Sequence, residues 1–205
     1  MTTQKHVTTV DMIRHGEPVG GKKYRGHRDD PLSEKGWGQM RTAVGDVCHW
    51  DALVSSPLLR CAAFAEDLSA TYCLPLTYDA RWKEIGFGVW EGKTADEIAL
   101  EDPAALRQFF DDPVTFCPEG AEPLALFNQR VVEVFNELLV AHRGQRVLVV
   151  AHAGVIRMVL QHVLAIPFSH VFRIDVPNAG VTRFEIYSDE TGAHPKLMFH
   201  AGSLR

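Results

Sequence analysis

Two histidines and two arginines lie at or soon after the ends of apolar segments. His15 follows Arg14 at the end of a β-branched stretch. His152 follows the apolar run 147–150, and Arg60 comes soon after a third, shorter apolar stretch. A neutral imidazole can attack phosphorus, and a guanidinium can bind phosphoryl oxygens through paired hydrogen bonds without losing its charge. These residue types therefore favour phosphoryl-transfer chemistry.

Phosphoryl transfer also needs a proton donor for the leaving oxygen, and a carboxylic acid can supply one. Three glutamates compete for this role, namely Glu84, Glu91 and Glu97. A second imidazole would add a hydrogen-bond donor, and a positive charge if it is protonated. The amides at the start of the helix after Gly154 would add further donors, aided by the helix dipole. The residue types alone leave the choice of acid open.

Strands and helices alternate along the chain. Strands are predicted, from β-branched content and apolar patterning, over residues 7–13, 52–55, 146–151 and 182–186. One helix is predicted after an N-cap at Ser33, and a second has Pro57 in its first turn. Further helices are predicted over 94–110, with a break at Pro103, and over 124–138 and 156–163. Loops are predicted over 19–31 and 111–120. This alternation indicates a three-layer α/β domain.

The predicted strands also indicate where the chemistry lies. In open α/β sheets, ligands bind beyond the carboxyl ends of the strands. His15 and His152 both come directly after a predicted strand. We therefore expect the two imidazoles to meet in one crevice, although they are far apart in the sequence.

Composition narrows the class of protein. The 205 residues are 46% hydrophobic, which fits one domain over residues 1–205 with a sizeable core. The net charge of −5 provides no bulk attraction for nucleic acid or an anionic membrane. An anionic substrate must therefore be bound by a local cluster of positive groups.

The location predicted from the sequence is cytoplasmic. The first residues lack the apolar region of a signal peptide, and no apolar run reaches about 18 residues. The four cysteines have no zinc-site spacing, so we expect four reduced thiols in or near the core: Cys48, Cys61, Cys73 and Cys117. Neither a metal site nor a cofactor is expected.

From Val10 to about Gly180, the chain resembles the histidine phosphatase superfamily, which includes the cofactor-dependent phosphoglycerate mutases. The resemblance rests on five motifs in the expected order: Ile13-Arg14-His15-Gly16-Glu17, Pro31-Leu32-Ser33-Glu34-Lys35-Gly36, Ser55-Ser56-Pro57-Leu58-Leu59-Arg60, the segment from Glu84 to Gly92, and Val150-Ala151-His152-Ala153-Gly154-Val155. One such triplet would be weak evidence, whereas five in order are strong.

The resemblance implies a role for each candidate. His15 would become phosphorylated, and Arg14 would bind the phosphoryl group. Arg60 and His152 would complete the phosphate pocket. Glu84, rather than the other two glutamates, would be the general acid and base. The implied fold is phosphoglycerate mutase-like, a mixed, mostly parallel sheet between helices in an α/β/α arrangement, and it would need no metal.

Some positions depart from the family pattern or extend it. Ala153 stands where many members have glycine, but its backbone N–H stays available to the substrate. Glu17 is followed by proline where many members have threonine, so a polar phosphate contact is missing or replaced. Arg25 and His27 lie in the loop after the nucleophile, where they are either solvated or in contact with the substrate beyond its phosphate. Glu17 has the same two interpretations.

Local motifs are most similar to the alpha-ribazole phosphatase branch, which acts in cobalamin biosynthesis. The predicted function is a phosphomonoesterase acting on a small phosphorylated metabolite such as alpha-ribazole 5'-phosphate. A broad-specificity sugar-phosphate phosphatase, a phosphoglycerate mutase and a non-catalytic phosphate-binding protein stay open as alternatives. The mutases are usually longer, with an insertion that excludes water. No nucleic-acid or membrane partner is expected, and a homodimer is left open.

Overall fold

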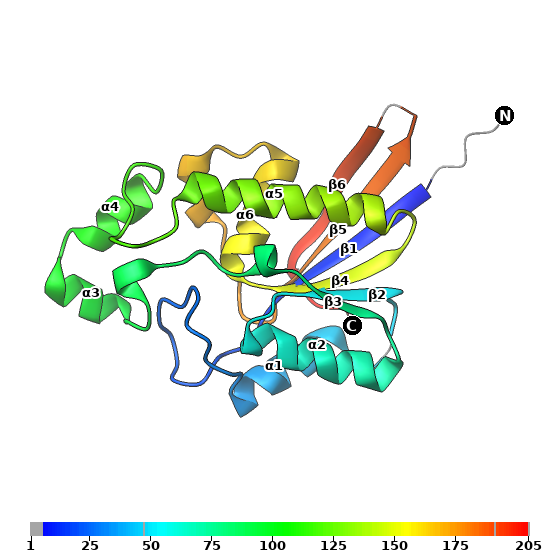
Figure 1. Cartoon of the computed structure of the whole chain (residues 1–205), viewed down its shortest axis with the longest axis horizontal. Coiled ribbons are helices and arrows are strands. Elements are labelled where there is room, and N and C mark those ends of the chain that lie inside the picture. The colour runs from blue at the N-terminus through cyan, green and yellow to red at the C-terminus, as the bar shows by residue number, and fades with distance from the viewer. Residues whose placement is uncertain (1–5, 47, 191, 205) are drawn as a thin grey trace.

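The computed structural model describes residues 6–46, 48–190 and 192–204, through which a six-stranded sheet runs. The strand order is β3-β2-β4-β1-β5-β6. The strands are β1 (His6–Arg14), β2 (Ala52–Ser55), β3 (Leu76–Tyr78), β4 (Arg146–Ala151), β5 (Val181–Asp189) and β6 (Gly192–Gly202). The first four in spatial order are parallel, and β5 and β6 are antiparallel to their neighbours. Helices cover both faces (Figure 1), which confirms the three-layer α/β/α fold with a mixed, mostly parallel sheet.

β4 is buried because helices cover both faces of the sheet. Two of these helices lie on each face, and they are α1 (Glu34–Val44) with α2 (Leu59–Tyr72), and α5 (Leu124–Ala141) with α6 (Ala153–Leu164). Val147 and Val149 pack in the core on the α5 and α6 side, whereas Leu148 and Val150 pack on the α1 and α2 side. All four side chains are fully buried. The continuous apolar run is therefore explained by burial on both faces.

Two short helices lie beyond the carboxyl ends of the parallel strands (Figure 1). They are α3 (Ala95–Glu101) and α4 (Ala105–Asp111), and Pro103 lies between them as predicted. Their apolar sides form a separate cluster in which the rings of Tyr24 and Phe109 both contact Trp90. Three 3-10 helices complete the chain, namely η1 (Ala80–Trp82), η2 (Gly88–Trp90) and η3 (Phe168–Arg173). The loop after β1 and these helices thus border the same end of the sheet.

Local signals explain some of the helix boundaries. Ser33 is the N-cap of α1, and its Oγ accepts a 3.0 Å hydrogen bond from the amide of Gly36, as its residue type predicts. Pro57 was expected in the first turn of a helix, but α2 starts at Leu59 and its N-cap residue is Leu58. Pro57 therefore lies before the helix, and that detail of the prediction was wrong.

Two strands were not predicted from the sequence. β3 has only three residues and lies in a stretch whose glycines hide any periodicity. β6 contains Pro195, which argues against an interior strand. The sheet accommodates this proline because β6 is an edge strand, where no further strand needs its missing N–H.

All four cysteines are free. Cys61 is buried and Cys48 is half-buried, but Cys73 and Cys117 are exposed. The expectation of four thiols in or near the core was therefore wrong for two of them. Within the described ranges, no helix has the length and apolar character needed to cross a membrane.

A buried carboxylate connects the two halves of the sheet. Asp11 on β1 is 1% exposed, and it accepts hydrogen bonds of 2.7 and 2.9 Å from the Arg183 guanidinium on β5. Its other partner is the indole N–H of Trp50, at 2.9 Å. Since each donor is satisfied by the same carboxylate, removal of that carboxylate leaves buried groups without partners.

We therefore expect Asp11→Ala to lower the free energy of unfolding by about 2–4 kcal/mol. Urea unfolding at pH 7 measures this loss. Asp67→Asn is the control, because it disrupts an exposed ion pair with Arg41 at 3.6 Å and should change stability by less than about 1 kcal/mol. Equal losses in the two variants would contradict the role given to Asp11.

Candidate active site

Strand register brings the two histidines together. β1 and β4 are parallel neighbours, and Arg14 pairs with Ala151 at their carboxyl ends. The next residues are His15 and His152, whose ring centroids lie 5.2 Å apart in an edge-on arrangement. The backbone amide of His15 also donates to the carbonyl of Ala151 at 3.0 Å. The expected meeting of these imidazoles in one place is confirmed.

His15 is held as a neutral imidazole with one defined tautomer. Its Nδ1 lies 2.7 Å from the backbone carbonyl of Gly16. A carbonyl only accepts, so Nδ1 carries the proton and Nε2 keeps its lone pair. Burial lowers the pKa of His15 well below its ordinary value, and the charges of Arg60 and Arg14 lower it further. The side chain therefore presents an unprotonated nitrogen with a free lone pair, as nucleophilic attack requires.

Arg14 and Arg60 each carry an unsatisfied buried N–H. Arg14 donates from one terminal nitrogen to the carbonyl of Val176 at 2.6 Å, and its Nε has no partner. Arg60 is fully buried in the first turn of α2, and its Nε also has no partner. Among the described residues these are the only buried side-chain donors left unpaired. Because an unpaired buried donor is costly, the two point to an anion that is bound during function.

The terminal nitrogens of Arg60 hold the loop after β1. They donate to the carbonyls of Arg28 and Gly26, both at 2.7 Å, and to that of Arg25 at 3.4 Å. The Glu91 carboxylate binds the same stretch, because it accepts hydrogen bonds from the backbone amides of residues 26, 27 and 28 at 3.0–3.1 Å. One cation and one anion therefore hold the backbone of this loop against the site.

His152 is the N-cap residue of α6 and is fully buried. Its Nε2 shares a 2.8 Å hydrogen bond with the hydroxyl of Ser56, and the Cys61 thiol lies 3.6 Å from the same nitrogen. Burial lowers the pKa of His152 well below its ordinary value, and the charge of Arg60 adds to this shift. The second imidazole is therefore neutral in this structure, and the extra charge considered for a protonated ring is not present.

Glu84 is the glutamate beside the histidines. Its carboxylate accepts from the amide of Ile85 and from that of Gly154, each at 3.0 Å, and its side chain is buried. A Cβ at position 154 would lie 2.1 Å from the Glu84 Oε1, so a larger residue there would displace this carboxylate. The Gly154 amide, next to the helix amides expected to bind a phosphate, is bound to this carboxylate.

The other two glutamates have structural contacts. Glu91 accepts from three loop amides and from the amide of Phe87 at 2.9 Å. Glu97 forms the capping box at the start of α3 together with Thr94. Only the Glu84 carboxylate, of the three, binds the segment that follows His152, so the geometry favours Glu84 as the acid.

Arg130 positions the segment that carries Glu84. It lies on α5 and donates to the carbonyls of Arg81 at 2.6 Å, Lys83 at 2.8 Å and Glu84 at 3.0 Å. Its Nε donates to Glu122 at 2.7 Å. The sequence did not predict the contacts of Arg130 or Ser56, because their partners are distant in the chain and no local spacing connects them.

Three further predicted residues have contacts within the protein. Arg25 is buried and donates to Asp30 and to the carbonyls of residues 19 and 21. The Nε2 of His27 lies 3.1 Å from the carbonyl of Glu84. Glu17 forms a 2.7 Å ion pair with Lys35. Their substrate contacts stay predictions, and Arg25 in particular serves to shape the loop.

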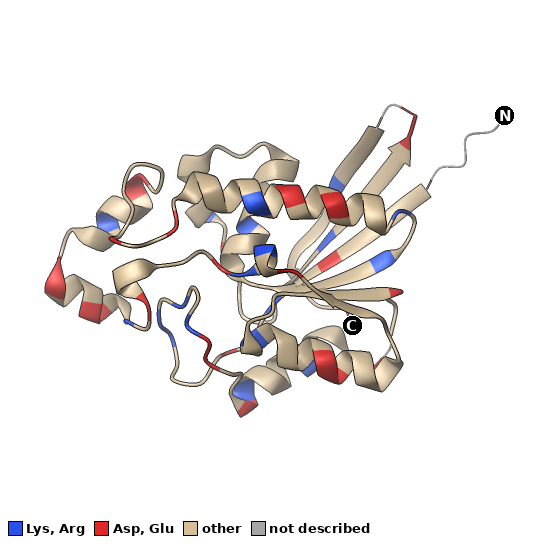
Figure 2. Ribbon diagram, in the orientation of Figure 1, with Lys and Arg blue, Asp and Glu red and all other residues tan. Residues whose placement is uncertain are grey.

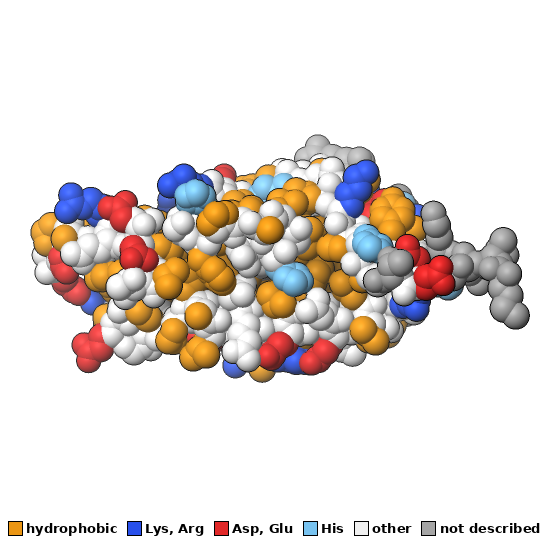
Figure 3. All heavy atoms as spheres, turned by 90° about the horizontal axis from the view of Figure 1, so that it is seen from above, with side chains coloured by type: hydrophobic (Ala, Val, Ile, Leu, Met, Phe, Trp, Pro, Cys, Tyr) orange, Lys and Arg blue, Asp and Glu red, His pale blue; other side chains and the backbone are white. Residues whose placement is uncertain are grey.

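Positive charge follows the loop after β1. Figure 2 shows several basic residues along this loop, next to the carboxyl ends of the strands. On the face seen in Figure 3, hydrophobic side chains predominate and basic side chains lie mainly near its edges. Basic residues are thus prominent at the candidate site, as an anionic ligand of an acidic protein requires.

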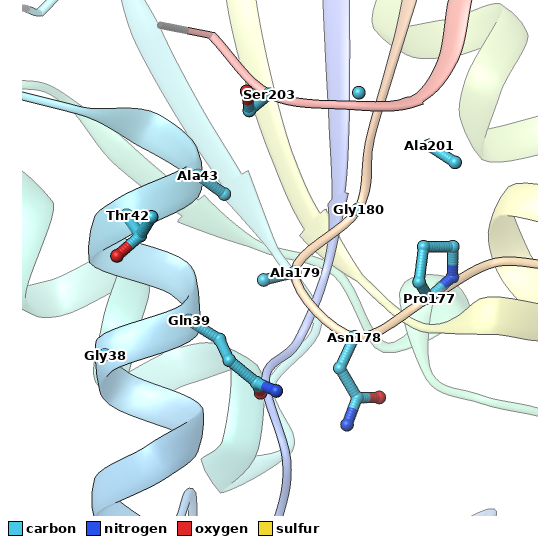
Figure 4. Close-up of a pocket in the computed structure, with 11 residues that line it drawn as sticks. Gly38, Gln39, Thr42, Ala43, Pro177, Asn178, Ala179, Gly180, Ala201 and Ser203 are labelled. Atoms are coloured by element: carbon cyan, nitrogen blue, oxygen red, sulfur yellow. The ribbon is translucent and has the colours of Figure 1, made fainter.

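A surface hollow of about 410 Å³ lies against the 177–180 turn (Figure 4). Its lining is neutral and includes Gln39, Thr42, Asn178 and Ser203. The backbone of the 177–180 turn binds Arg14 through the Gly180 carbonyl at 3.2 Å. This hollow contains none of the predicted catalytic residues and lacks the cations that an anion site needs. Within the described ranges, no cluster of three or more His, Cys, Asp or Glu side chains is placed to hold a metal ion.

Comparison with known proteins identifies relatives that share most of this chain. A bifunctional protein of Mycobacterium tuberculosis is 31% identical over 187 residues, which are 89% of this chain and 51% of that protein. The chain thus spans about half the length of the mycobacterial relatives it matches. Phosphoserine phosphatase 1 of Hydrogenobacter thermophilus is 29% identical over 174 residues, or 82% of each chain. Adenosylcobalamin/alpha-ribazole phosphatase of Salmonella typhimurium is 28% identical over 170 residues, or 80% of this chain and 84% of that one.

A solved structure agrees with these relatives. The native mycobacterial glucosyl-3-phosphoglycerate phosphatase superposes with a TM-score of 0.84 and 25% identity, over 98% of this chain and 100% of that one. The profile of the histidine phosphatase superfamily (branch 1) matches residues 10–194, which contain both imidazoles, both arginines and Glu84. The chain therefore belongs to the histidine phosphatase superfamily.

Proposed function

We propose that this protein is a phosphomonoesterase that forms a covalent phosphohistidine at His15. The observation that carries the proposal is the pair of unpartnered, buried Nε–H groups of Arg14 and Arg60. They accompany an imidazole whose Nε2 is free and uncharged. A phosphoryl group would satisfy both donors while its phosphorus faces that nitrogen.

The reaction has two steps. In the first, the lone pair of His15 Nε2 attacks phosphorus and the ester P–O bond breaks, while Glu84 donates a proton to the leaving oxygen. In the second, Glu84 removes a proton from water, the water oxygen bonds to phosphorus, and the P–N bond breaks. Arg14, Arg60 and His152 stabilise the phosphoryl oxygens in both steps. The backbone N–H of Ala153, at the start of α6, is a further proposed donor.

The narrower proposal concerns the substrate. The local motifs and the identity to the Salmonella enzyme support alpha-ribazole 5'-phosphate, an intermediate of cobalamin biosynthesis. The identity to a phosphoserine phosphatase is equally high, so the substrate class must come from the geometry of the site. A panel of phosphorylated metabolites that includes both esters tests this, with release of inorganic phosphate as the measurement.

Two alternatives predict other outcomes. A phosphoglycerate mutase would convert 3-phosphoglycerate in a coupled assay without net release of phosphate. A non-catalytic phosphate-binding protein would bind phosphate and release none from p-nitrophenyl phosphate. The presence of a free nucleophile, a buried acid and two arginines in one place favours turnover over binding alone.

We also propose that residues 1–205 form one histidine phosphatase domain and that the protein is cytoplasmic. The four free cysteines support a reducing compartment. The homodimer left open by the sequence stays a prediction, which analytical ultracentrifugation tests.

Replacement of the nucleophile should abolish the reaction. We expect His15→Ala to reduce p-nitrophenyl phosphate turnover by at least about 10⁴-fold, because no other group can form the covalent intermediate. Acid quenching of the wild-type enzyme during turnover should trap acid-labile phosphate on His15. Gly38→Ala is the control, since a Cβ there meets nothing within 4 Å and turnover should be unchanged. Acid-labile phosphate on a different residue would refute the mechanism.

Loss of the proposed acid should depend on the leaving group. We expect Glu84→Gln to slow alkyl phosphates by about 10²- to 10⁴-fold and p-nitrophenyl phosphate much less, because nitrophenolate leaves without a proton. Steady-state kinetics with the two esters measure the difference. Glu97→Gln is the matched control and should leave both rates near the wild type. If Glu84→Gln slowed both esters equally, proton donation by Glu84 would lose its support.

The buried neutral imidazoles should make stability depend on pH. The pKa values of His15 and His152 lie well below 6.5 in the folded state, so the unfolded chain binds their protons first. Stability is therefore fully present above pH 6.5 and falls below it, by about 1.4 kcal/mol per pH unit for each ring. Between pH 7.5 and 5.5, urea unfolding should show a loss about 1 kcal/mol larger in the wild type than in His15→Gln. Identical losses would show that His15 is not kept neutral by the fold.

A further inference from the structure

Arg157 is a third guanidinium next to the candidate site, and the proposed reaction does not use it. It lies on α6 one turn after Gly154, so both residues share one face of the helix. Gly154 binds Glu84 on that face. Arg157 Nε donates to the carbonyl of Ile174 at 2.9 Å, and its guanidinium lies 5.6 Å from the ring of Phe172.

Arg157 and Arg14 are attached to the same short segment. Arg14 donates to the carbonyl of Val176, two residues after the Ile174 carbonyl that Arg157 binds. Ile174 has extended backbone dihedrals, and Val176 precedes a proline, which favours an extended backbone. In an extended chain, carbonyls two residues apart point the same way and lie about 7 Å from each other. The two guanidiniums are therefore neighbours along one edge of the site.

The outer nitrogens of Arg157 are available to a ligand. In the described part of the chain, its two terminal nitrogens have no hydrogen-bond partner and no carboxylate lies within ion-pair distance of it. Burial lowers the pKa of Arg157, and the charges of Glu84 and Asp175 oppose that shift. The hydrogen bond from Nε orients the side chain, and the two terminal nitrogens stay available as donors.

Glu84 determines which part of a substrate meets Arg157. The acid must lie at the leaving oxygen, since it protonates that oxygen. Arg157 is on the helix face that Glu84 contacts, one turn further from His152. A substrate whose phosphoryl group binds Arg14 would thus extend its leaving group toward Arg157.

We propose that Arg157 binds a carboxylate of the leaving group, so that the preferred substrates are small phosphorylated carboxylic acids. This inference rests on the proposed phosphatase function and deepens it, and it favours acids over the alpha-ribazole 5'-phosphate that the local motifs suggest. The two guanidiniums are bonded to carbonyls about 7 Å apart, and this placement suits a phosphate and a carboxylate separated by a few carbon atoms. An arginine fork matches the two oxygens of a carboxylate, and an uncharged sugar or base would leave that charge unpaired.

The first experiment compares two esters with the wild-type protein. 3-Phosphoglycerate and glycerol 3-phosphate share a primary leaving oxygen and differ in a carboxylate against a hydroxymethyl group. We expect kcat/KM for phosphate release to be about 10- to 100-fold higher for 3-phosphoglycerate, the effect typical of a hydrogen-bonded charged group. An equal or lower value, or a higher value for alpha-ribazole 5'-phosphate than for 3-phosphoglycerate, would overturn the proposal.

The second experiment removes the guanidinium of Arg157. Arg157→Gln should abolish most of the preference for 3-phosphoglycerate, and Arg157→Lys, which keeps the charge but not the fork, should retain part of it. The ratio of the two kcat/KM values is the measurement, because a merely structural role would lower both esters together and leave the ratio unchanged. That unchanged ratio would overturn the proposal. Arg143→Gln, at an exposed arginine in a turn, is the control and should keep the wild-type ratio.

Hydrolysis of p-nitrophenyl phosphate distinguishes a failure of the role given to Arg157 from a failure of the proposed phosphatase function. Its hydrolysis by the wild type, together with no preference for the carboxylate, would refute the role of Arg157 and leave the phosphatase function intact. If no ester released phosphate at all, the proposed function itself would fail, and this inference with it. Circular dichroism melting of each variant shows whether a changed ratio comes from a folded protein.

Discussion

The parallel pairing of β1 with β4 is the constraint on which the site depends. The register that pairs Arg14 with Ala151 places His15 beside His152, although the two lie far apart along the chain. A shift of one residue would turn every side chain of a strand to the other face. Because β4 is buried on both faces, such a shift would exchange its side chains between the two cores, where they would no longer fit the packing. The core thus enforces the geometry of the site.

Burial then determines the chemistry of the groups that this register collects. Two imidazoles with lowered pKa values stay neutral beside two arginines, so positive charge and a free lone pair coexist in one small volume. In water the same groups would be solvated and mobile. Here the buried Nε atoms of Arg14 and Arg60 each keep a hydrogen bond to donate, which a bound anion would accept.

The acid is placed by contacts from three separate elements. Gly154 on α6 binds the Glu84 carboxylate, whereas Arg130 on α5 and His27 in the loop after β1 contact its carbonyl. Arg157 lies on the same face of α6 as Gly154, so one helix connects the acid to the end of the site where a leaving group would lie. This connection explains how one fold can keep its reacting groups constant while neighbouring positions select the substrate.

The sequence by itself determined the three-layer fold, the alternation of its main elements and the candidate residues His15, His152, Arg14, Arg60 and Glu84, because local periodicity and ordered motifs carry that information. The edge strand β6 was missed, since Pro195 argues locally against a strand and only its edge position permits it. Tertiary structure alone gave Glu91 and Glu97 their structural contacts, assigned the amide of Gly154 to Glu84, and brought Ser56 to His152. Each of these depends on contacts between residues distant in the chain, which no local spacing can encode.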